Sequence, residues 1–178
     1  MIFFILKTYT DLFSDFALIS VLKFSLVAMG GTFDIVHKGH LTLLSNAFEI
    51  SDKVIIGLTS DEFAVKKGKT TINKYEKRLE NLTKIISKEF PNSSFQISKL
   101  DNDFGPAVLK KEVEALVVSD ETSNQGNILN KLREERNLPP VKVIIIPMFL
   151  AKDGIRISTT RIKNSEIDAD GNLLSIDK

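Results

Sequence analysis

Runs of consecutive apolar residues recur along this chain of 178 residues, and segments with helical spacing separate most of them. A strand that is apolar at consecutive positions is buried on both faces, which is typical of a parallel sheet covered by helices on its two sides. We therefore predict a doubly wound α/β fold with a parallel sheet of about five strands. The strands are predicted at residues 23–29, 53–59, 94–100, 115–119 and 141–147.

The segments between these strands carry apolar residues at the spacing of an amphipathic helix. In the clearest of them Leu79, Leu82 and Ile86 share one face, and Pro91 ends the pattern. The polar loop 60–73 and the connector 104–114 each have room for one short helix. The other helices are predicted at residues 40–50, 74–90 and 122–137, with a last one that begins at Ser158 or Thr159.

The chain length suits one compact domain, which we place at residues 23–173. Residues 1–22 are rich in Phe, Leu and Ile, but three charged residues interrupt any run that would approach the roughly 20 residues of a membrane span. We expect this segment to be the product of an upstream start codon or a loosely attached extension. The alternative is an amphipathic segment that packs on the core or on a partner subunit. The polar tail from about Asp168, including residues 174–178, is expected to be mobile.

The composition argues against several classes of function. With a formal net charge of +1, the chain has no electrostatic preference for nucleic acid or for an anionic membrane. It contains no cysteine, which excludes disulfides, thiolate nucleophiles and cysteine metal sites. Its only imidazoles are those of His37 and His40, so a histidine-rich metal site is unavailable. A site of histidine with carboxylates stays open, although we predict no metal ligands among the site residues. We expect a cytoplasmic protein, and the sequence leaves its oligomeric state open.

Polar segments follow four of the predicted strands, each soon after the strand ends. They are residues 30–40, 60–73, 119–122 and 157–161. In a doubly wound sheet, ligands bind outside the carboxyl ends of the strands, where the strand order reverses. The four segments are therefore predicted to converge on one ligand site at that edge.

The first of these segments reads GGTFDIVHKGH and combines glycines with paired histidines. Gly30, Gly31 and Gly39 let a ligand approach the main chain, and a helix that begins near Gly39 directs its free N–H groups and positive dipole end at the loop. His37 and His40 add two imidazole donors. Together these groups predict a phosphate pocket suited to a nucleotide. The alternative is a helix cap followed by a surface histidine.

The segment before the last predicted helix also has two interpretations. Ser158, Thr159 and Thr160 with Arg161 are typical of a helix cap, because Ser and Thr are favoured there. At the same edge of the sheet they also fit a second phosphate cradle, because the arginine donor fork matches a phosphate group. The segment 168–171, which resembles part of a calcium loop, is predicted to be a turn because the other calcium ligands are missing.

Two further groups of residues are candidates for the same site. Lys66, Lys67 and Lys69 form a charge run of the kind that is usually solvated, and we expect Lys66 or Lys67 to reach the site. The residues after the strand 115–119 are either a turn with a cap or nucleoside and substrate contacts. They are Ser119, Asp120 and Glu121.

The order of these motifs resembles that of the nucleotidyltransferase superfamily marked by HxGH and ISSTR-type sequences. Within it, the chain is most similar to the archaeal-type phosphopantetheine adenylyltransferases, over roughly residues 23–173. The stretches that carry the resemblance are GGTFDIVHKGH, GLTSDEF, YEKRLENL, DFGPA, ALVVSDET, IPMFLAKDG and ISTTRIKNSEID. Thr159 stands where serine is usual, and it keeps the hydroxyl. The resemblance implies a Rossmann-like sheet, the HxGH nucleotidyltransferase fold.

The resemblance also implies an activity: transfer of AMP from ATP to phosphopantetheine, which gives dephospho-coenzyme A and pyrophosphate. Mg²⁺ is expected to enter with the ATP. The implied catalytic residues are His37, His40, Lys66 and Arg161. The residues implied to bind nucleotide or substrate are Gly30, Gly31, Thr32, Phe33, Gly39, Lys67, Ser119, Asp120, Glu121, Ser158, Thr159 and Thr160.

Two alternatives remain at this stage. One keeps the reaction class and changes the acceptor to nicotinamide mononucleotide, FMN or, with CTP, glycerol phosphate. The other is a non-catalytic nucleotide-binding protein on the same fold. Because both histidines, the hydroxyl cluster and Arg161 are present, the usual sign of an inactive site is missing.

Overall fold

A computed structural model describes residues 23–105 and 109–174 of the chain. The predicted extension 1–22, the middle of the connector 104–114 and residues 175–178 lie outside this part. The elements in chain order are β1 (Phe24–Gly31), α2 (Lys38–Glu49), β2 (Ser51–Thr59), α3 (Asp61–Lys66), α4 (Tyr75–Glu89), β3 (Phe95–Leu100), β4 (Ala115–Ser119), the 3₁₀ turn η1 (Asp120–Thr122), α6 (Asn124–Glu134), β5 (Lys142–Ile146) and α7 (Thr159–Lys163).

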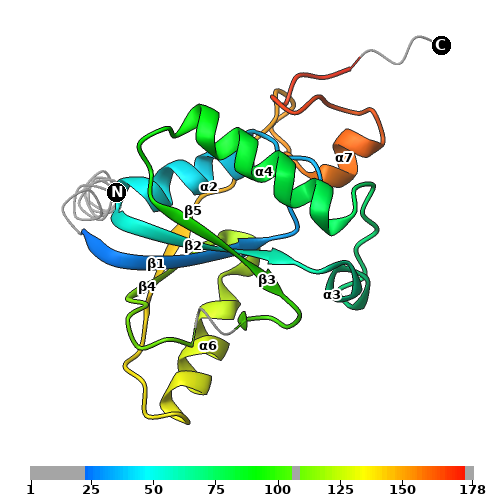
Figure 1. Cartoon of the computed structure of the whole chain (residues 1–178). Helices are drawn as coiled ribbons and strands as arrows, with labels where there is room; N and C mark the ends of the chain where they lie inside the picture. The colour runs from blue at the N-terminus through cyan, green and yellow to red at the C-terminus, as the bar shows by residue number, and fades with distance from the viewer. Residues whose placement is uncertain (1–22, 106–108, 175–178) are drawn as a thin grey trace, which may run out of the picture.

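The strands form one parallel five-stranded sheet in the order β3-β2-β1-β4-β5. Helices α2 and α4 cover one face of the sheet, and α6 covers the other (Figure 1). The chain runs outward from β1 to β3 and then returns to place β4 on the other side of β1. This confirms the predicted doubly wound α/β fold and places the reversal of strand order between β1 and β4.

Alternate residues of the central strands pack into two cores, one on each face of the sheet. Val27 of β1 and Ile56 of β2 belong to the core under α2 and α4, which also contains Leu82. Ala28 and Ile55, the neighbours of those two strand residues, belong to the core that Leu129 of α6 completes. Because both faces are buried, the strands are apolar at consecutive positions, as the sequence pattern predicted.

Two details differ from the sequence expectations. The helix predicted at 122–137 is shorter, because η1 precedes it and Asn137 adopts a left-handed backbone conformation with φ 55°. The tail from Asp168 is not loose, because Ile167 is fully buried and the Asp168 side chain accepts hydrogen bonds from the N–H groups of Asp170 and Asn172. The predicted turn at 168–171 is confirmed, and it packs against the domain.

Helices α3 and α7 both lie on the side of the molecule where the strands end (Figure 1). The short helix α3 confirms the one expected in the loop 60–73, and α7 begins at Thr159 as predicted. Among the described residues, no helix is long and apolar enough to cross a bilayer.

Candidate functional site

The loop after β1 has a backbone that depends on its glycines. Phe33 adopts a left-handed conformation with φ 48°, which is uncommon for a bulky residue, and its ring is buried. A Cβ atom on Gly31 would lie 2.9 Å from Cε2 of that ring, so a side chain at position 31 would push the ring out of place. The Phe33 ring in turn lies against the imidazole of His40, with 4.9 Å between ring centroids. The glycine therefore sets the position of the histidine through the aromatic ring.

The two imidazoles stack on each other at the start of α2. Their centroids are 3.8 Å apart, and the main-chain N–H of His37 donates to Nδ1 of the His40 ring over 3.4 Å. Since Nδ1 of His40 accepts this hydrogen bond, a neutral His40 ring carries its proton on Nε2. A Cβ on Gly39 would lie only 3.2 Å from the His37 ring, which explains the glycine between the histidines.

Burial keeps both imidazoles neutral near pH 7. It lowers the pKa of His37 from 6.5 to about 4. The pKa of His40 is held well below its usual value, first by burial and then by electrostatic repulsion from His37, when that ring is protonated, and from Lys69, although a hydrogen bond to the Ile35 carbonyl opposes them. Each neutral ring offers one donor and one acceptor, and a bound anion would favour the charged form.

Three buried side-chain atoms have no hydrogen-bond partner among the described residues: two belong to residues at the ends of β1 and β2, and the third to the residue that precedes α2. They are Oγ1 of Thr32, Nδ1 of His37 and Oγ1 of Thr59. Buried polar atoms almost always have a partner, so these three mark a place where a polar ligand fits. Thr59, the last residue of β2, was not among the predicted site residues.

The start of α2 offers fewer main-chain donors than the sequence suggested. The Lys38 N–H donates to the Ala169 carbonyl over 2.9 Å, and the His40 N–H donates to the His37 carbonyl. The Gly39 N–H donates to no described residue. One amide rather than several therefore faces the predicted phosphate pocket, beside the unpartnered Nδ1 of His37.

Asp34 joins three of the converging segments. Its buried carboxylate accepts hydrogen bonds from the N–H groups of Ile72 and Asn73, both at 2.9 Å, and lies 2.6 Å from Nζ of Lys163 on α7. Burial opposes its charge, but the hydrogen bonds from Lys163 and the two amides outweigh it and lower the pKa of Asp34. Asp34 was not among the predicted site residues.

Arg78 lies directly beneath the loops and was also missed. Its guanidinium is fully buried and donates to the Thr32 and Thr59 carbonyls over 2.7 and 2.8 Å. It also donates to Oδ1 of Asp61 over 2.9 Å and to the Asn73 carbonyl over 3.1 Å. A signal was present in the sequence, because position 78 precedes Leu82 by one helical turn and so lies on the apolar face of α4.

In α7 the cap interpretation is confirmed, since Oγ of Ser158 accepts from the Arg161 N–H over 3.3 Å. The Arg161 guanidinium pairs with the carboxylate of Asp153 and lies 3.0 Å from that of Glu166. These carboxylates, Asp153 first, raise its pKa further. Thr159 and Thr160 form the first turn of α7. Phosphate binding by this segment stays a prediction, because in this conformation Arg161 is held by carboxylates.

The expectation that Lys66 or Lys67 of the lysine-rich loop reaches the site stays a prediction. Lys67 forms an ion pair with Asp103, beyond the end of β3. Lys66 ends α3 with an exposed side chain. Lys69 is the member of the run whose charge lowers the pKa of His40.

The segment after β4 is tied to the loop that precedes α7. Glu121 forms an ion pair with Arg156 at 2.5 Å. Oγ of Ser119 lies 3.2 Å from Oγ1 of Thr122, and the Asp120 carbonyl accepts from Oγ of Ser123. Together with the contacts of Asp34, the ion pair of Glu121 links the four predicted polar segments at the carboxyl edge of the sheet.

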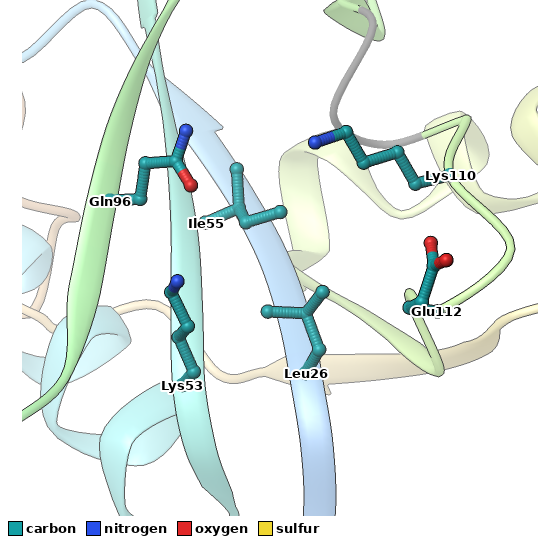
Figure 2. A pocket seen from close by; sticks show the side chains of 6 residues that line it. All are labelled: Leu26, Lys53, Ile55, Gln96, Lys110 and Glu112. Atoms are coloured by element: carbon teal, nitrogen blue, oxygen red, sulfur yellow. The ribbon is translucent and has the colours of Figure 1, made fainter.

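A cavity of about 470 Å³ lies elsewhere, away from the histidines. It is placed over the amino-terminal half of β1, β2 and β3 on the α6 face of the sheet (Figure 2). Figure 2 shows Leu26 and Ile55 at its floor, with Lys53 and Gln96 on one side, and Lys110 and Glu112 on the other. The candidate site is instead an open edge, identified by its unpartnered polar atoms.

Comparison with known proteins shows which family the described domain is similar to. The model of a family described as cytidylyltransferase-like matches residues 28–165. A phosphopantetheine adenylyltransferase of Methanothermobacter thermautotrophicus is 41% identical over 152 residues, which cover 85% of this chain and 91% of the relative. The phosphopantetheine adenylyltransferase of Pyrococcus furiosus is also 41% identical, over 84% of this chain and 94% of the relative.

Solved structures share the fold. A protein of unknown function from Archaeoglobus fulgidus superposes with a TM-score of 0.62 at 28% identity, over 68% of this chain and 88% of that chain. A pantoate-beta-alanine ligase from Francisella tularensis, solved with beta-gamma ATP and beta-alanine, gives a TM-score of 0.50 at 14% identity, over 79% of this chain and 65% of that chain. The second likeness concerns the fold alone.

Proposed function

This chain belongs to the cytidylyltransferase-like family, and on that basis we propose that it transfers AMP from ATP to phosphopantetheine and releases pyrophosphate. The observation that carries the proposal is the set of unpartnered atoms of Thr32, His37 and Gly39, which all belong to the polar segment that follows β1. The relatives that match most of the chain are named for this activity.

The reaction needs two phosphate-bearing substrates in line. The phosphate of phosphopantetheine attacks the α-phosphorus of ATP, a new P–O bond forms, and the bond to the leaving pyrophosphate breaks. No covalent enzyme intermediate is required, which fits a chain without cysteine. Catalysis then consists of positioning and of stabilising the charge that develops on the phosphate oxygens.

The two histidines are suited to that second task. They are neutral before ATP binds, so they present N–H donors without the cost of a buried charge pair. A triphosphate beside them raises the pKa of both rings and strengthens these hydrogen bonds as negative charge accumulates. We assign His37 and His40 to the triphosphate, and Thr32 with the main chain of Gly30 and Gly31 to the attacking phosphate.

Arg161, Ser158 and Thr160 would hold the β and γ phosphates. This role requires the Arg161 guanidinium to exchange Asp153 and Glu166 for phosphate oxygens, which are also anionic acceptors that suit its donor fork. Lys66 or Lys67 would neutralise the substrate phosphate, and Lys69, whose charge lowers the pKa of His40, is a third candidate in the same loop.

ATP would be used as its magnesium complex. Within the described residues, no three His, Asp or Glu side chains are grouped to hold a metal ion. Mg²⁺ usually keeps several waters and binds substrate phosphates with few protein ligands, so the ion can arrive on the triphosphate. The magnesium is thus part of the substrate, and the chain contributes hydrogen-bond donors around it.

The test is a pyrophosphate-release assay with ATP or CTP against phosphopantetheine, nicotinamide mononucleotide, FMN and glycerol phosphate. We expect turnover with ATP and phosphopantetheine. His40→Ala should lower turnover by about 10²–10³ while the circular dichroism spectrum and unfolding midpoint stay close to wild type. Lys88→Ala, at the far end of α4 with an exposed side chain, is the matched control and should leave turnover unchanged.

The outcomes separate the candidate functions. Turnover with another acceptor keeps the reaction class and changes the substrate. ATP binding without turnover against the whole panel supports a non-catalytic nucleotide-binding protein. Near-normal turnover by His40→Ala removes the assigned role of that histidine.

A further inference from the structure

One side chain bridges the carboxyl ends of β1 and β2, just beyond the last paired residues of the two strands. The last aligned pair of these two strands is Gly31 with Leu58, so Thr32 and Thr59 are the next residues of two adjacent strands. Their carbonyl oxygens accept hydrogen bonds from the two terminal nitrogens of Arg78, Nη1 to Thr32 over 2.7 Å and Nη2 to Thr59 over 2.8 Å. A planar guanidinium fixes the spacing of two acceptors bound side by side.

Burying the Arg78 guanidinium costs more desolvation free energy than an apolar side chain would cost at the same position. Arg78 is completely buried, and Asp61, at 2.9 Å, is the one carboxylate among the described residues that pairs with it. An apolar side chain would fill the same place on α4 at lower desolvation cost. A buried arginine with four acceptors is therefore better explained by what it positions than by the stability that it adds.

The residues that it positions both carry an unpartnered hydroxyl. Oγ1 of Thr32 and Oγ1 of Thr59 are buried and have no hydrogen-bond partner in the described part of the chain, and Thr59 is only 7% exposed. A threonine hydroxyl can donate one hydrogen bond to a phosphate oxygen. Two such hydroxyls at the ends of neighbouring strands can bind two oxygens of the same phosphate group.

The topology indicates which phosphate this is. In a doubly wound sheet the nucleotide occupies the crevice where the strand order reverses, which here lies between β1 and β4. Thr59 ends β2, on the opposite side of β1 from that crevice. A phosphate bound between Thr32 and Thr59 therefore lies beside the nucleotide, at the place of the attacking group.

We propose that Thr59 is a further substrate-binding residue, which with Thr32 holds the phosphate of the acceptor, and that Arg78 is the positioning residue that sets the distance between them. This inference rests on the proposed transfer reaction. It predicts that substitutions at Thr59 or Arg78 raise the KM for the acceptor and leave the KM for ATP nearly unchanged.

The first test compares Thr59→Val with Thr59→Ser. Valine keeps the shape of threonine and removes the donor, so the KM for phosphopantetheine should rise about 10-fold or more, as expected for one hydrogen bond to a charged group. The KM for ATP should stay within about 2-fold of wild type, because that substrate makes no contact with Thr59 in this proposal. Thr59→Ser, which restores the hydroxyl, should return the acceptor KM toward the wild-type value.

The second test compares two fully buried arginines. Arg78→Lys removes the planar guanidinium that binds both carbonyls. It should raise the KM for the acceptor and lower kcat, while the KM for ATP changes little. Arg133 is equally buried and donates to the carbonyls of Pro139 and Lys110, on the α6 side of the sheet. Arg133→Lys should lower the unfolding midpoint without changing either KM.

Three results would overturn the inference. One is an unchanged acceptor KM in Thr59→Val, and another is equal loss of affinity for both substrates. The third is the same kinetic change in Arg133→Lys as in Arg78→Lys. If the wild type releases no pyrophosphate, the proposed transfer reaction is wrong. Calorimetry can then still compare the affinity of the wild type for phosphopantetheine with that of Thr59→Val. If the wild type does not bind phosphopantetheine at all, both proposals are overturned.

Discussion

Nζ of Lys163 lies 2.6 Å from Oδ2 of Asp34, so the last described helix is joined directly to the loop that follows the first strand. The same Nζ donates to the Thr70 carbonyl over 2.5 Å, which adds the lysine-rich loop to the contact. Asp34 is almost fully buried and Lys163 is about one-fifth exposed, so water screens this ion pair less than a surface pair. One contact therefore connects three segments that are far apart in the sequence.

We predict strong energetic coupling between these two residues. In a double-mutant cycle with Asp34→Asn and Lys163→Met, the coupling energy should be about 1–3 kcal/mol by urea unfolding. The exposed pair of Lys23 and Asp52, at 2.7 Å with side chains 70% and 59% exposed, is the matched control and should give less than about 1 kcal/mol. Equal coupling in the two cycles would show that the buried pair has no special role.

The pKa of His37 predicts how stability depends on pH. Its folded-state value of about 4 lies below the ordinary 6.5, so the unfolded state binds more protons between these values. Stability is therefore lost as pH falls from 6.5 toward 4, by on the order of 3 kcal/mol from this residue.

His37→Asn should lose less stability than wild type over this interval, as measured by urea unfolding at two pH values, one near neutrality and one close to the folded-state pKa of His37. Asp34, whose pKa is lowered, also contributes to acid unfolding, but it is present in both proteins and cancels in the comparison. ATP should shift the midpoint of the His37 titration upward when followed by NMR. Identical pH profiles in the two proteins would contradict a buried, neutral His37.

The contact between Gly31 and Phe33 predicts a defect from one added methyl group. In Gly31→Ala the new Cβ lies 2.9 Å from the Phe33 ring, so this ring, which lies against His40, must shift. Overpacking of this kind costs about 1–3 kcal/mol, and we expect turnover to fall as well, because the imidazole is displaced. Gly30→Ala is the neighbouring control, since its Cβ would meet the flexible end of Leu100 at 3.3 Å and should cost less. Equal losses of stability at both positions would argue against the chain of contacts through Phe33.

The carboxylates around Arg161 predict opposite effects of two substitutions. Arg161→Gln should weaken ATP binding about 10-fold or more, because a charge-assisted donor to phosphate is lost. Asp153→Asn weakens a competitor for the same guanidinium and should leave ATP affinity unchanged or improve it. Isothermal calorimetry with MgATP measures both. If Arg161 only braces its own segment, both variants will lose affinity together.

The strands of the sheet can be predicted well from the sequence, because each strand is indicated by a short run of neighbouring residues. Consecutive apolar residues such as those of β4 are required wherever both faces of a strand are covered, and β4 has the predicted bounds, Ala115–Ser119. The convergence of the polar segments also follows, since the carboxyl ends of parallel strands meet at one edge. The helix α6 is shorter than predicted, because its start depends on η1 and its end on one left-handed residue, Asn137.

Contacts between residues far apart in the chain could not be predicted from the sequence. Arg78 has the pattern of an ordinary charge in an amphipathic helix, although it lies on the buried face and binds two strand ends. A charge run likewise does not indicate which of its lysines acts on a distant group, and here Lys69 lowers the pKa of His40. The tail after Asp168 is polar and so resembles a mobile end, yet its polar side chains fix its own turn.

The hydrogen bond from the Lys38 N–H to the Ala169 carbonyl has a consequence for how the protein is made. The last strand, β5, ends at Ile146, and Ala169 lies far beyond it in the chain. Since synthesis runs from the amino end, the whole sheet can assemble on a nascent chain before Ala169 has left the ribosome. Lys163, which secures the loop after β1, also arrives late. The contacts that secure the loop after β1 therefore form only after the sheet has been synthesised, and a polypeptide cut short before Lys163 would keep the strands while losing these contacts.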